Sequence, residues 1–266
     1  MLIIQPIGGL CNRMRSINSA YKLAAMRGDR LTIIWFCNQE LGCSFDSIFQ
    51  LNPDIRLINI TSKLDMRKIF YQITSQYIGN EEIRTNRTGS TLDENFRSSL
   101  KKRCYIATEE HFYPADSYAL FRPLPELQQK IDAIISVFSA PTVGIHIRRT
   151  DNLPSIGNSS TDAFVTAMWE ELNKNSDTYF YLATDDESEE SYLRTLFPDR
   201  IISNTNKDLS RDSLRGMQDA LIDLYCLAST DKIIGSFYSS FTDIAADMHH
   251  IPKIIAGTDS SGGNAL

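Results

Sequence analysis

The sequence is short of the features that mark membrane proteins, disulfide-bonded secreted proteins and zinc proteins. None of its apolar runs approaches the ~20 residues that cross a bilayer, and its start lacks the basic region and long apolar core of a signal peptide. Its five cysteines are odd in number and scattered, and its four histidines include one adjacent pair. We therefore expect a cytoplasmic protein, soluble or peripheral at the inner membrane face, with reduced thiols and no bound metal.

Positive charge is also scarce. The chain carries 27 Lys and Arg against 33 Asp and Glu, a net charge of −6. This balance argues against general nucleic-acid binding, because phosphate backbones select basic surfaces. With 266 residues, 42% of them hydrophobic, the chain can form one large domain or two modest ones. If the ligand is a nucleotide, the positive charge of its site must therefore come from a few neighbouring residues.

Strand and helix patterns alternate along most of the chain, which predicts the α/β class with parallel sheets. In the first half we expect a helix that ends near Gly28, and strands at 2–5, 31–36, 56–60 and 104–108. In the second half we expect strands at 142–148, 179–183, 200–202, 232–235 and 252–255, and helices at 161–173, 187–196, 213–228 and 239–248. Residues 61–102 are polar with mixed periodicity; a mobile loop or acceptor-facing insertion fits them, but we favour a solvated connection.

A domain boundary is expected near Pro123-Leu124-Pro125, where two prolines precede a helix predicted at about 126–138. The segments on either side, 1–123 and 124–266, each repeat the strand and helix alternation. We therefore predict two Rossmann-like domains.

The stretch from Val143 to Asp151 is a short apolar strand that ends in Arg148 and Arg149. Open parallel sheets bind ligands outside the carboxyl ends of their strands, and guanidinium groups suit phosphate because they donate to two oxygens at once. Two solvated surface arginines are the alternative interpretation.

Three other segments combine a turn with polar groups. Gly8 and Gly9 lie between a strand and a helix, where paired glycines let the backbone approach an anionic ligand. Their spacing is neither the dinucleotide fingerprint nor a Walker loop. Asp185 and Asp186 follow the strand at 179–183, and Ser239 and Ser240 follow the one at 232–235. Each of these last two pairs could bind near a ligand or cap the next helix.

Several of these segments together resemble the GDP-fucose-dependent fucosyltransferases. The phrase His146-Ile147-Arg148-Arg149-Thr150-Asp151 is similar to their His-x-Arg-Arg-x-Asp motif, and the resemblance extends in order over about residues 142–250. The supporting phrases are Ala183-Thr184-Asp185-Asp186, Ser213-Leu214-Arg215-Gly216, the serines after Phe237, and an N-terminal Gly8-Gly9-Leu10-x-Asn12 like that of α-1,2-fucosyltransferases.

The resemblance implies a GT-B-like fold, in which two Rossmann-like domains face a cleft. The N-terminal domain, 1–123, would serve the acceptor, and the C-terminal domain, 124–266, the GDP-sugar donor. The implied enzyme is a glycosyltransferase that moves L-fucose from GDP-fucose to a hydroxyl of a glycan acceptor. It implies no metal and no further cofactor. A transferase for another nucleotide sugar, or a non-catalytic nucleotide- or glycan-binding relative, remains as an alternative.

The resemblance also assigns roles to residues. Arg148 would stabilise the departing diphosphate, with Arg149 orienting or binding beside it. Asp223 would accept hydrogen bonds from the guanine edge, and Asp219 is a competing assignment. The remaining donor-binding expectations are Gly8, Gly9, Asn12, His146, Asp185, Asp186, Arg215, Ser239 and Ser240.

The general base is the least defined role. Among the GDP-fucose-dependent fucosyltransferases that the chain resembles, the α-1,6 enzymes have a glutamate shortly after the arginine motif, whereas residues 152–161 contain no acid here. Asp151 and Asp162 are the two candidates, because either could take the acceptor's proton if it lies close enough.

Overall fold

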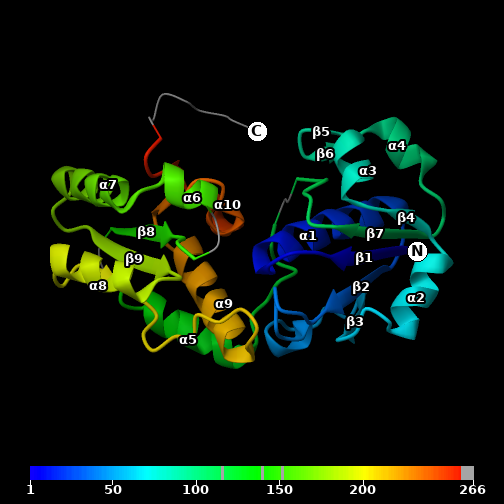
Figure 1. The fold of residues 1–266 in the computed structure, drawn as a ribbon, viewed down its shortest axis with the longest axis horizontal. Coiled ribbons are helices and arrows are strands. Elements are labelled where there is room, and N and C mark those ends of the chain that lie inside the picture. Colours follow the sequence, from blue (N-terminus) through cyan, green and yellow to red (C-terminus); the bar gives the residue numbers. More distant parts are fainter. Residues whose placement is uncertain (115–116, 139–140, 151–152, 259–266) are drawn as a thin grey trace. The chain divides into compact units, whose positions relative to one another are not determined.

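The computed structural model of the chain describes residues 1–114, 117–138, 141–150 and 153–258 (Figure 1). It divides into two compact units. Unit 1 comprises Met1–Leu124 and Ser210–Met217, and unit 2 comprises Pro125–Leu209 and Gln218–Leu266. None of the helices in the described part of the chain is both long and apolar enough to span a bilayer.

Unit 1 contains a five-stranded parallel sheet in the order β3-β2-β1-β7-β4. Its strands are β1 (Leu2–Pro6), β2 (Leu31–Phe36), β3 (Ile55–Ile60), β4 (Gln76–Ile78) and β7 (Cys104–Thr108). The central strands are almost wholly buried, as their continuous apolar sequences predict for a sheet covered on both faces. A 3-10 turn, η1 (Phe45–Ser47), lies between β2 and β3.

Helix α1 (Leu10–Arg27) follows the glycine turn and packs against this sheet. It ends as the sequence predicts, because Gly28 adopts the left-handed conformation at φ 64°. The Gly28 N–H donates to the Ala25 carbonyl and the next N–H, of Asp29, to the Ala24 carbonyl. These bonds satisfy carbonyls that the end of a helix leaves without a partner.

The interpretation of residues 61–102 as a plain solvated connection is wrong over much of the segment. The segment forms α2 (Met66–Ile73), β4, α3 (Asn80–Thr85), the hairpin of β5 (Arg87–Thr88) and β6 (Thr91–Leu92), and α4 (Glu94–Ser99). Asp65 caps α2 by accepting from the Arg67 N–H at 2.9 Å, and Glu82 accepts from the Gly79 N–H at 3.0 Å. Apart from α2, these elements have only two to six residues, which is too few for a clear hydrophobic period.

Unit 2 contains the second parallel sheet, in the order β10-β9-β8-β11-β12. Its strands are β8 (Thr142–Ile147), β9 (Tyr179–Thr184), β10 (Ile201–Ile202), β11 (Lys232–Gly235) and β12 (Lys253–Ile255). Helices lie on both faces of the sheet in Figure 1. They are α5 (Pro125–Ile135), α6 (Leu153–Asn158), α7 (Thr161–Lys174), α8 (Glu187–Leu196), α9 (Leu214–Ala228) and α10 (Ser240–His249). The expected α/β class with parallel sheets is confirmed.

The two faces of β8 are packed differently. Val143, Ile145 and Ile147 belong to the buried cluster that includes Phe164 of α7. Gly144 faces the other way, where a Cβ atom would lie 2.8 Å from the Thr230 hydroxyl and 2.9 Å from a Leu227 methyl group. The end of α9 therefore approaches this face of the strand closely, which a larger residue would prevent.

Each sheet has a topological switch point, where successive strands begin to be added on the opposite side. In unit 2 it lies between β8 and β11, and in unit 1 between β1 and β7. Such points open a crevice at the carboxyl edge of a parallel sheet, and ligands bind there. The arginine motif follows β8, and the glycine turn follows β1.

Candidate functional site at the carboxyl edge of the second sheet

The carboxyl end of β8 is joined to β11 by Ser236. The Ser236 hydroxyl donates to the His146 carbonyl at 3.2 Å and accepts from the Arg148 N–H at 3.0 Å. The Ser236 N–H also donates to the His146 carbonyl, at 3.0 Å. This fully buried serine therefore fixes the backbone of Arg148 at the switch point.

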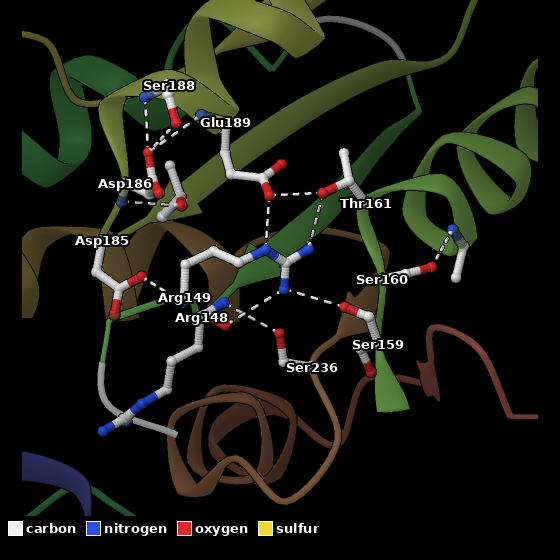
Figure 2. Close-up of polar contacts among 12 residues, drawn as sticks. Arg148, Arg149, Ser159, Ser160, Thr161, Asp185, Asp186, Ser188, Glu189 and Ser236 are labelled. Carbon is white, nitrogen blue, oxygen red and sulfur yellow. Dashed lines mark hydrogen bonds and ion pairs between the residues drawn. The ribbon is translucent and has the colours of Figure 1, made fainter. Parts of the chain in front are cut away.

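The side chains of the two arginines take different directions. Figure 2 shows the Arg149 guanidinium turned toward Glu189 and Thr161, whereas the Arg148 side chain extends away from them. Arg148 is half-buried, and it is the one whose guanidinium lies outside the Arg149 network. Arg148 is therefore the candidate for contact with a ligand, whereas Arg149 binds other residues of the protein.

Arg149 is bound on every side by the protein. Its Nε donates to Glu189 Oε1 at 2.6 Å, and its two terminal nitrogens donate to the Ser159 carbonyl at 3.0 Å and the Thr161 hydroxyl at 3.2 Å. The guanidinium also lies 5.8 Å from the ring centre of Phe164. The ion-paired side chains are only 11% and 10% exposed. The alternative of a solvated surface residue is therefore wrong for Arg149.

Asp185 holds the loop that follows β8. Its carboxylate accepts from the Arg149 N–H at 2.8 Å, from the Thr150 hydroxyl at 2.7 Å and from the Thr150 N–H at 3.4 Å (Figure 2). Hydrogen bonds to a charged acceptor are roughly twice as strong as neutral ones. Asp185 thus orders the backbone of the arginine motif.

Asp186 caps a helix instead. Its carboxylate accepts from the N–H groups of Ser188 at 2.7 Å and Glu189 at 3.3 Å at the start of α8. The Ser188 hydrogen bonds lower the pKa of the Asp186 carboxyl, and Arg149 contributes in the same direction. The capping interpretation is confirmed, and the cap places Glu189 in the first turn of α8, where it meets Arg149.

His146 is buried in the same edge of the sheet. Its Nδ1 lies 2.8 Å from the Thr242 hydroxyl and 3.4 Å from the Ser239 hydroxyl, and its ring stacks on Phe241 with centroids 4.8 Å apart. Burial lowers the pKa of His146 to about 3. The imidazole is therefore neutral at physiological pH and holds the start of α10 against β8.

Helix α10 presents its N-terminus at this edge. Ser239 is the N-cap, and its hydroxyl accepts from the Thr242 N–H at 3.5 Å, so the capping interpretation holds for Ser239. Ser240 is the first residue of the helix and is half-buried. The exposed Tyr238 precedes them in the left-handed region at φ 52°, where a bulky side chain is rare. Free N–H groups at a helix start suit a phosphate.

Asp223 lies deep in unit 2. Its two carboxylate oxygens accept from the Tyr181 hydroxyl at 2.6 Å and from Lys207 Nζ at 3.0 Å. Burial raises the pKa of Asp223, while Lys207 opposes that shift. The competing Asp219 is also buried and accepts from the Asp208 N–H at 2.9 Å. Both carboxylates thus have protein partners.

The glycine turn of unit 1 is held by a buried arginine. Gly8 has φ 82°, and its carbonyl accepts from Arg13 Nε at 2.7 Å. The other Arg13 nitrogens donate to the Phe36 carbonyl and to Asn38, and burial lowers the pKa of Arg13 to about 10. Gly9 has no atom within 4 Å of where a Cβ would lie. The turn is therefore rigid, and its surface at Gly9 is open.

Asn12 is positioned across the unit 1 switch point. Its Nδ2 lies 3.4 Å from Oε2 of Glu109, the residue that follows β7. The backbone carbonyl of Glu109 accepts from Arg15 at 3.0 Å. Polar groups from α1 and from the end of β7 therefore meet at the edge where a parallel sheet receives ligands.

The remaining predicted residues are Arg215, Asp162 and Asp151. Arg215 is exposed near the start of α9, in the segment that clusters with unit 1. Asp162 is exposed in the first turn of α7, beyond the cap that Ser160 provides. Asp151 lies outside the described residues. Within the described ranges, no group of three or more His, Cys, Asp or Glu side chains is arranged to hold a metal.

The sequence did not single out Glu189, Thr161, Ser159 or Ser236 as parts of the site. Glu189 is separated from Arg149 by 40 residues and Ser236 from Arg148 by 88. Only their positions in the sequence could have pointed to these residues. Ser236 directly follows a strand, and Glu189 lies three residues beyond a capping aspartate.

No protein-family model and no curated protein sequence matches the chain. Solved structures do. NodZ alpha-1,6-fucosyltransferase soaked with GDP-fucose is 16% identical over 93% of this chain and 92% of that one, with a TM-score of 0.65. POFUT1 in complex with GDP-fucose is 12% identical over 97% and 98%, with a TM-score of 0.62. An arginine-to-lysine mutant of FUT1 from Arabidopsis thaliana in complex with GDP is 13% identical over 96% and 69%, with a TM-score of 0.60.

These structures share the fold of the chain along almost its whole length. The expected GT-B-like fold class and the resemblance to GDP-fucose-dependent fucosyltransferases are thus confirmed at the level of fold. Identities of 12–16% do not extend to a reaction or a substrate. Function must be argued from the site.

Proposed function

We propose that the protein is a glycosyltransferase that moves L-fucose from GDP-fucose to a hydroxyl of a glycan acceptor. One observation carries the proposal. The His146-to-Thr150 part of the arginine motif lies at the switch point of the second sheet, with Arg148 fixed by Ser236 and Arg149 locked behind it. Ligands bind at that point in open parallel sheets, and the fold is shared with enzymes solved with GDP-fucose.

The chemistry assigns the larger role to Arg148. Transfer breaks the bond between the fucose anomeric carbon and the β-phosphate oxygen, while the acceptor oxygen bonds to that carbon and loses its proton. Negative charge grows on the β-phosphate, and a preorganised cation there stabilises the transition state more than the ground state. Arg149 acts on the reaction by orienting the backbone of Arg148, since a terminal nitrogen of Arg149 donates to the Arg148 carbonyl at 3.3 Å.

The start of α10 is the proposed partner of the diphosphate. Its N–H groups and the Ser240 hydroxyl supply donors, and the helix dipole favours negative charge. His146 supports this segment as a neutral ring through Ser239 and Thr242. Proton removal from the acceptor stays assigned to Asp151 or Asp162, and the GDP-fucose site is proposed to need no metal.

A transferase for a different nucleotide sugar is the second candidate. This candidate is favoured because Tyr181 and Lys207 already donate to the two carboxylate oxygens of Asp223. Guanine recognition requires a carboxylate that accepts from the guanine N1–H and the exocyclic amine. If guanine does bind Asp223, its N–H groups compete with Tyr181 and Lys207 for the carboxylate oxygens. Binding selectivity among nucleotides therefore separates the two candidates.

The test is calorimetric titration with GDP, ADP and UDP of the wild type, Arg148→Ala and Arg194→Ala. Arg194 provides the matched control because it is an exposed arginine of the same unit, paired with Glu190 on α8. We expect GDP alone to bind, with affinity lost in Arg148→Ala and kept in Arg194→Ala. Release of GDP from GDP-fucose with a panel of glycan acceptors then tests turnover.

Two results would contradict the proposal. If GDP fails to bind, or binds Arg148→Ala as well as the wild type, the donor site is not at the end of β8. If UDP or ADP binds in preference, the scaffold carries a different donor.

A further inference from the structure

Unit 1 exposes a group of large apolar side chains around α2. Of the thirteen large hydrophobic residues that are exposed in the described part of the chain, five lie within residues 64–77. They are Leu64 at 78% exposure, Met66 at 73%, Phe70 at 52%, Ile73 at 77% and Tyr77 at 52%. We refer to these five residues as the α2 face. Such a concentration marks an interaction surface more often than scattered single residues do.

The α2 face belongs to an anchored helix. Met66, Phe70 and Ile73 are spaced by four and three residues, so they lie on one side of α2. Tyr71, on the other side, is buried in the core cluster of the first sheet. Asp65 fixes the start of the helix through the Arg67 N–H. The helix therefore presents its apolar residues outward from a stable attachment (α2, cyan in Figure 1).

Basic residues outnumber acidic ones in the sequence around the α2 face. Residues 61–78 contain Lys63, Arg67 and Lys68 against the single acid Asp65, which is paired with Arg67 at 2.8 Å. The sequence Lys101-Lys102-Arg103 is held beside the end of α2. There the Arg103 guanidinium lies 5.2 Å from the Phe70 ring centre, and the Lys101 N–H donates to Gln76. This local excess of positive charge contrasts with a net charge of −6 for the chain.

We propose that the α2 face docks on the surface of a lipid membrane that carries anionic headgroups. Exposed apolar side chains enter the boundary between headgroups and acyl chains, while the surrounding Lys and Arg side chains are attracted to anionic lipid. The charge complementarity favours this partner over a second copy of the chain, which would place two basic surfaces against each other. Because α2 has eight residues, docking is shallow and reversible.

The test is co-sedimentation of the full chain with vesicles of phosphatidylcholine alone or with about 30% phosphatidylglycerol. We expect binding to the phosphatidylglycerol vesicles, and loss of binding at about 0.5 M NaCl because salt screens exposed charges. Leu64→Ser with Ile73→Ser, and separately Lys101→Gln with Lys102→Gln, should each weaken binding about tenfold or more. All four side chains are exposed, so these variants keep the fold.

The matched control is Val137→Ser with Tyr192→Ser, which removes two exposed apolar residues from unit 2. It should bind the vesicles as the wild type does. The proposal is overturned if the wild type does not bind, or if the Leu64/Ile73 variant and the Lys101/Lys102 variant both bind the vesicles as well as the wild type does. It is also overturned if the wild type self-associates through Leu64 and Ile73 without binding vesicles, because the face would then be a protein interface.

Discussion

Glu189 determines how Arg149 contributes to the motif. Its Oε1 accepts from Arg149 Nε and from the Thr161 hydroxyl, both at 2.6 Å, while Oε2 is buried and has no hydrogen-bond partner among the described residues. A buried ion pair contributes little in net terms, but removing one member leaves the other charge uncompensated. Glu189 and Arg149 must therefore be present together.

We expect Glu189→Ala to lower the free energy of unfolding by about 3 kcal/mol, because it leaves the Arg149 guanidinium buried and unpaired. Glu190→Ala is the control on the same helix. Its ion pair with Arg194 is more exposed, so the loss should stay below about 1 kcal/mol. Urea denaturation measures both values. Equal losses in the two variants would show that the Arg149 pair is no more than a surface contact.

Because His146 is buried, we expect the free energy of unfolding to depend on pH. In the unfolded chain a histidine takes up a proton below about pH 6.5, whereas in the folded protein burial lowers the pKa of His146 to about 3. Protonation thus favours the unfolded state, so this contribution is fully present above pH 6.5 and declines as pH falls toward 3. The decline should reach about 2 kcal/mol between pH 7 and pH 5.

The measurement compares the free energy of unfolding of the wild type and His146→Gln across that pH range. The difference between the two proteins isolates His146 from the other titrating groups. A difference that does not change between pH 7 and pH 5 would show that the imidazole is accessible to protons in the folded state.

At the scale of elements, the two glycines of the turn after β1 differ in why glycine is found there. Gly8 needs its positive φ, and a Cβ there would also lie 2.9 Å from Asn12 Nδ2. Gly9 has φ −74° and open space around it. We expect Gly8→Ala to cost about 1–2 kcal/mol in unfolding free energy, because an L-residue in the left-handed region is strained.

Gly9→Ala should leave the unfolding free energy within about 0.5 kcal/mol of the wild type. If the turn approaches a sugar nucleotide, Gly9→Ala will nevertheless weaken binding of GDP-fucose, because the methyl group occupies the open space. Thermal unfolding and titration of the same samples measure both effects. Unchanged binding in Gly9→Ala would remove Gly9 from the donor site.

Most elements could be predicted because their sequences carry one dominant signal. Leu31–Phe36 and Cys104–Thr108 are continuous apolar runs in buried strands, and their predicted bounds are those observed. Residues 61–102 and α6 lacked such a signal, since most of their elements have only two to six residues. Arg148, Arg149 and Asp185 were recognisable at strand ends. Glu189 and Ser236 were not, because only the folded sheet brings them to the motif.

For the molecule as a whole, the distribution of predicted donor residues over both units leads to a prediction from hydrogen exchange. Gly8, Gly9 and Asn12 belong to unit 1, whereas the arginine motif and α10 belong to unit 2. The diphosphate and base are assigned to unit 2. We therefore expect GDP to slow amide exchange at 148–150 and 236–243, and GDP-fucose to slow it there and also at 8–12.

UDP is the matched control, and it should change neither segment. The same exchange measurement on Arg148→Ala with GDP tests whether the slowed exchange depends on Arg148. Slowed exchange confined to unit 1 with GDP would place the nucleotide on the other sheet and reverse the assignment of the two domains.

The division of the chain into units has a consequence for how this protein can evolve. The backbone passes from one unit to the other at three positions, because Ser210–Met217 returns to unit 1 after Leu209. There the Arg211 carbonyl accepts from the Gly42 N–H, and a Cβ at position 42 would overlap the Asp212 backbone at 2.0 Å. Gene fusion or exchange that moves residues 125–266 alone separates this segment from the surface shaped to receive it. Exchange of residues 125–266 alone is therefore disfavoured, because it divides unit 1.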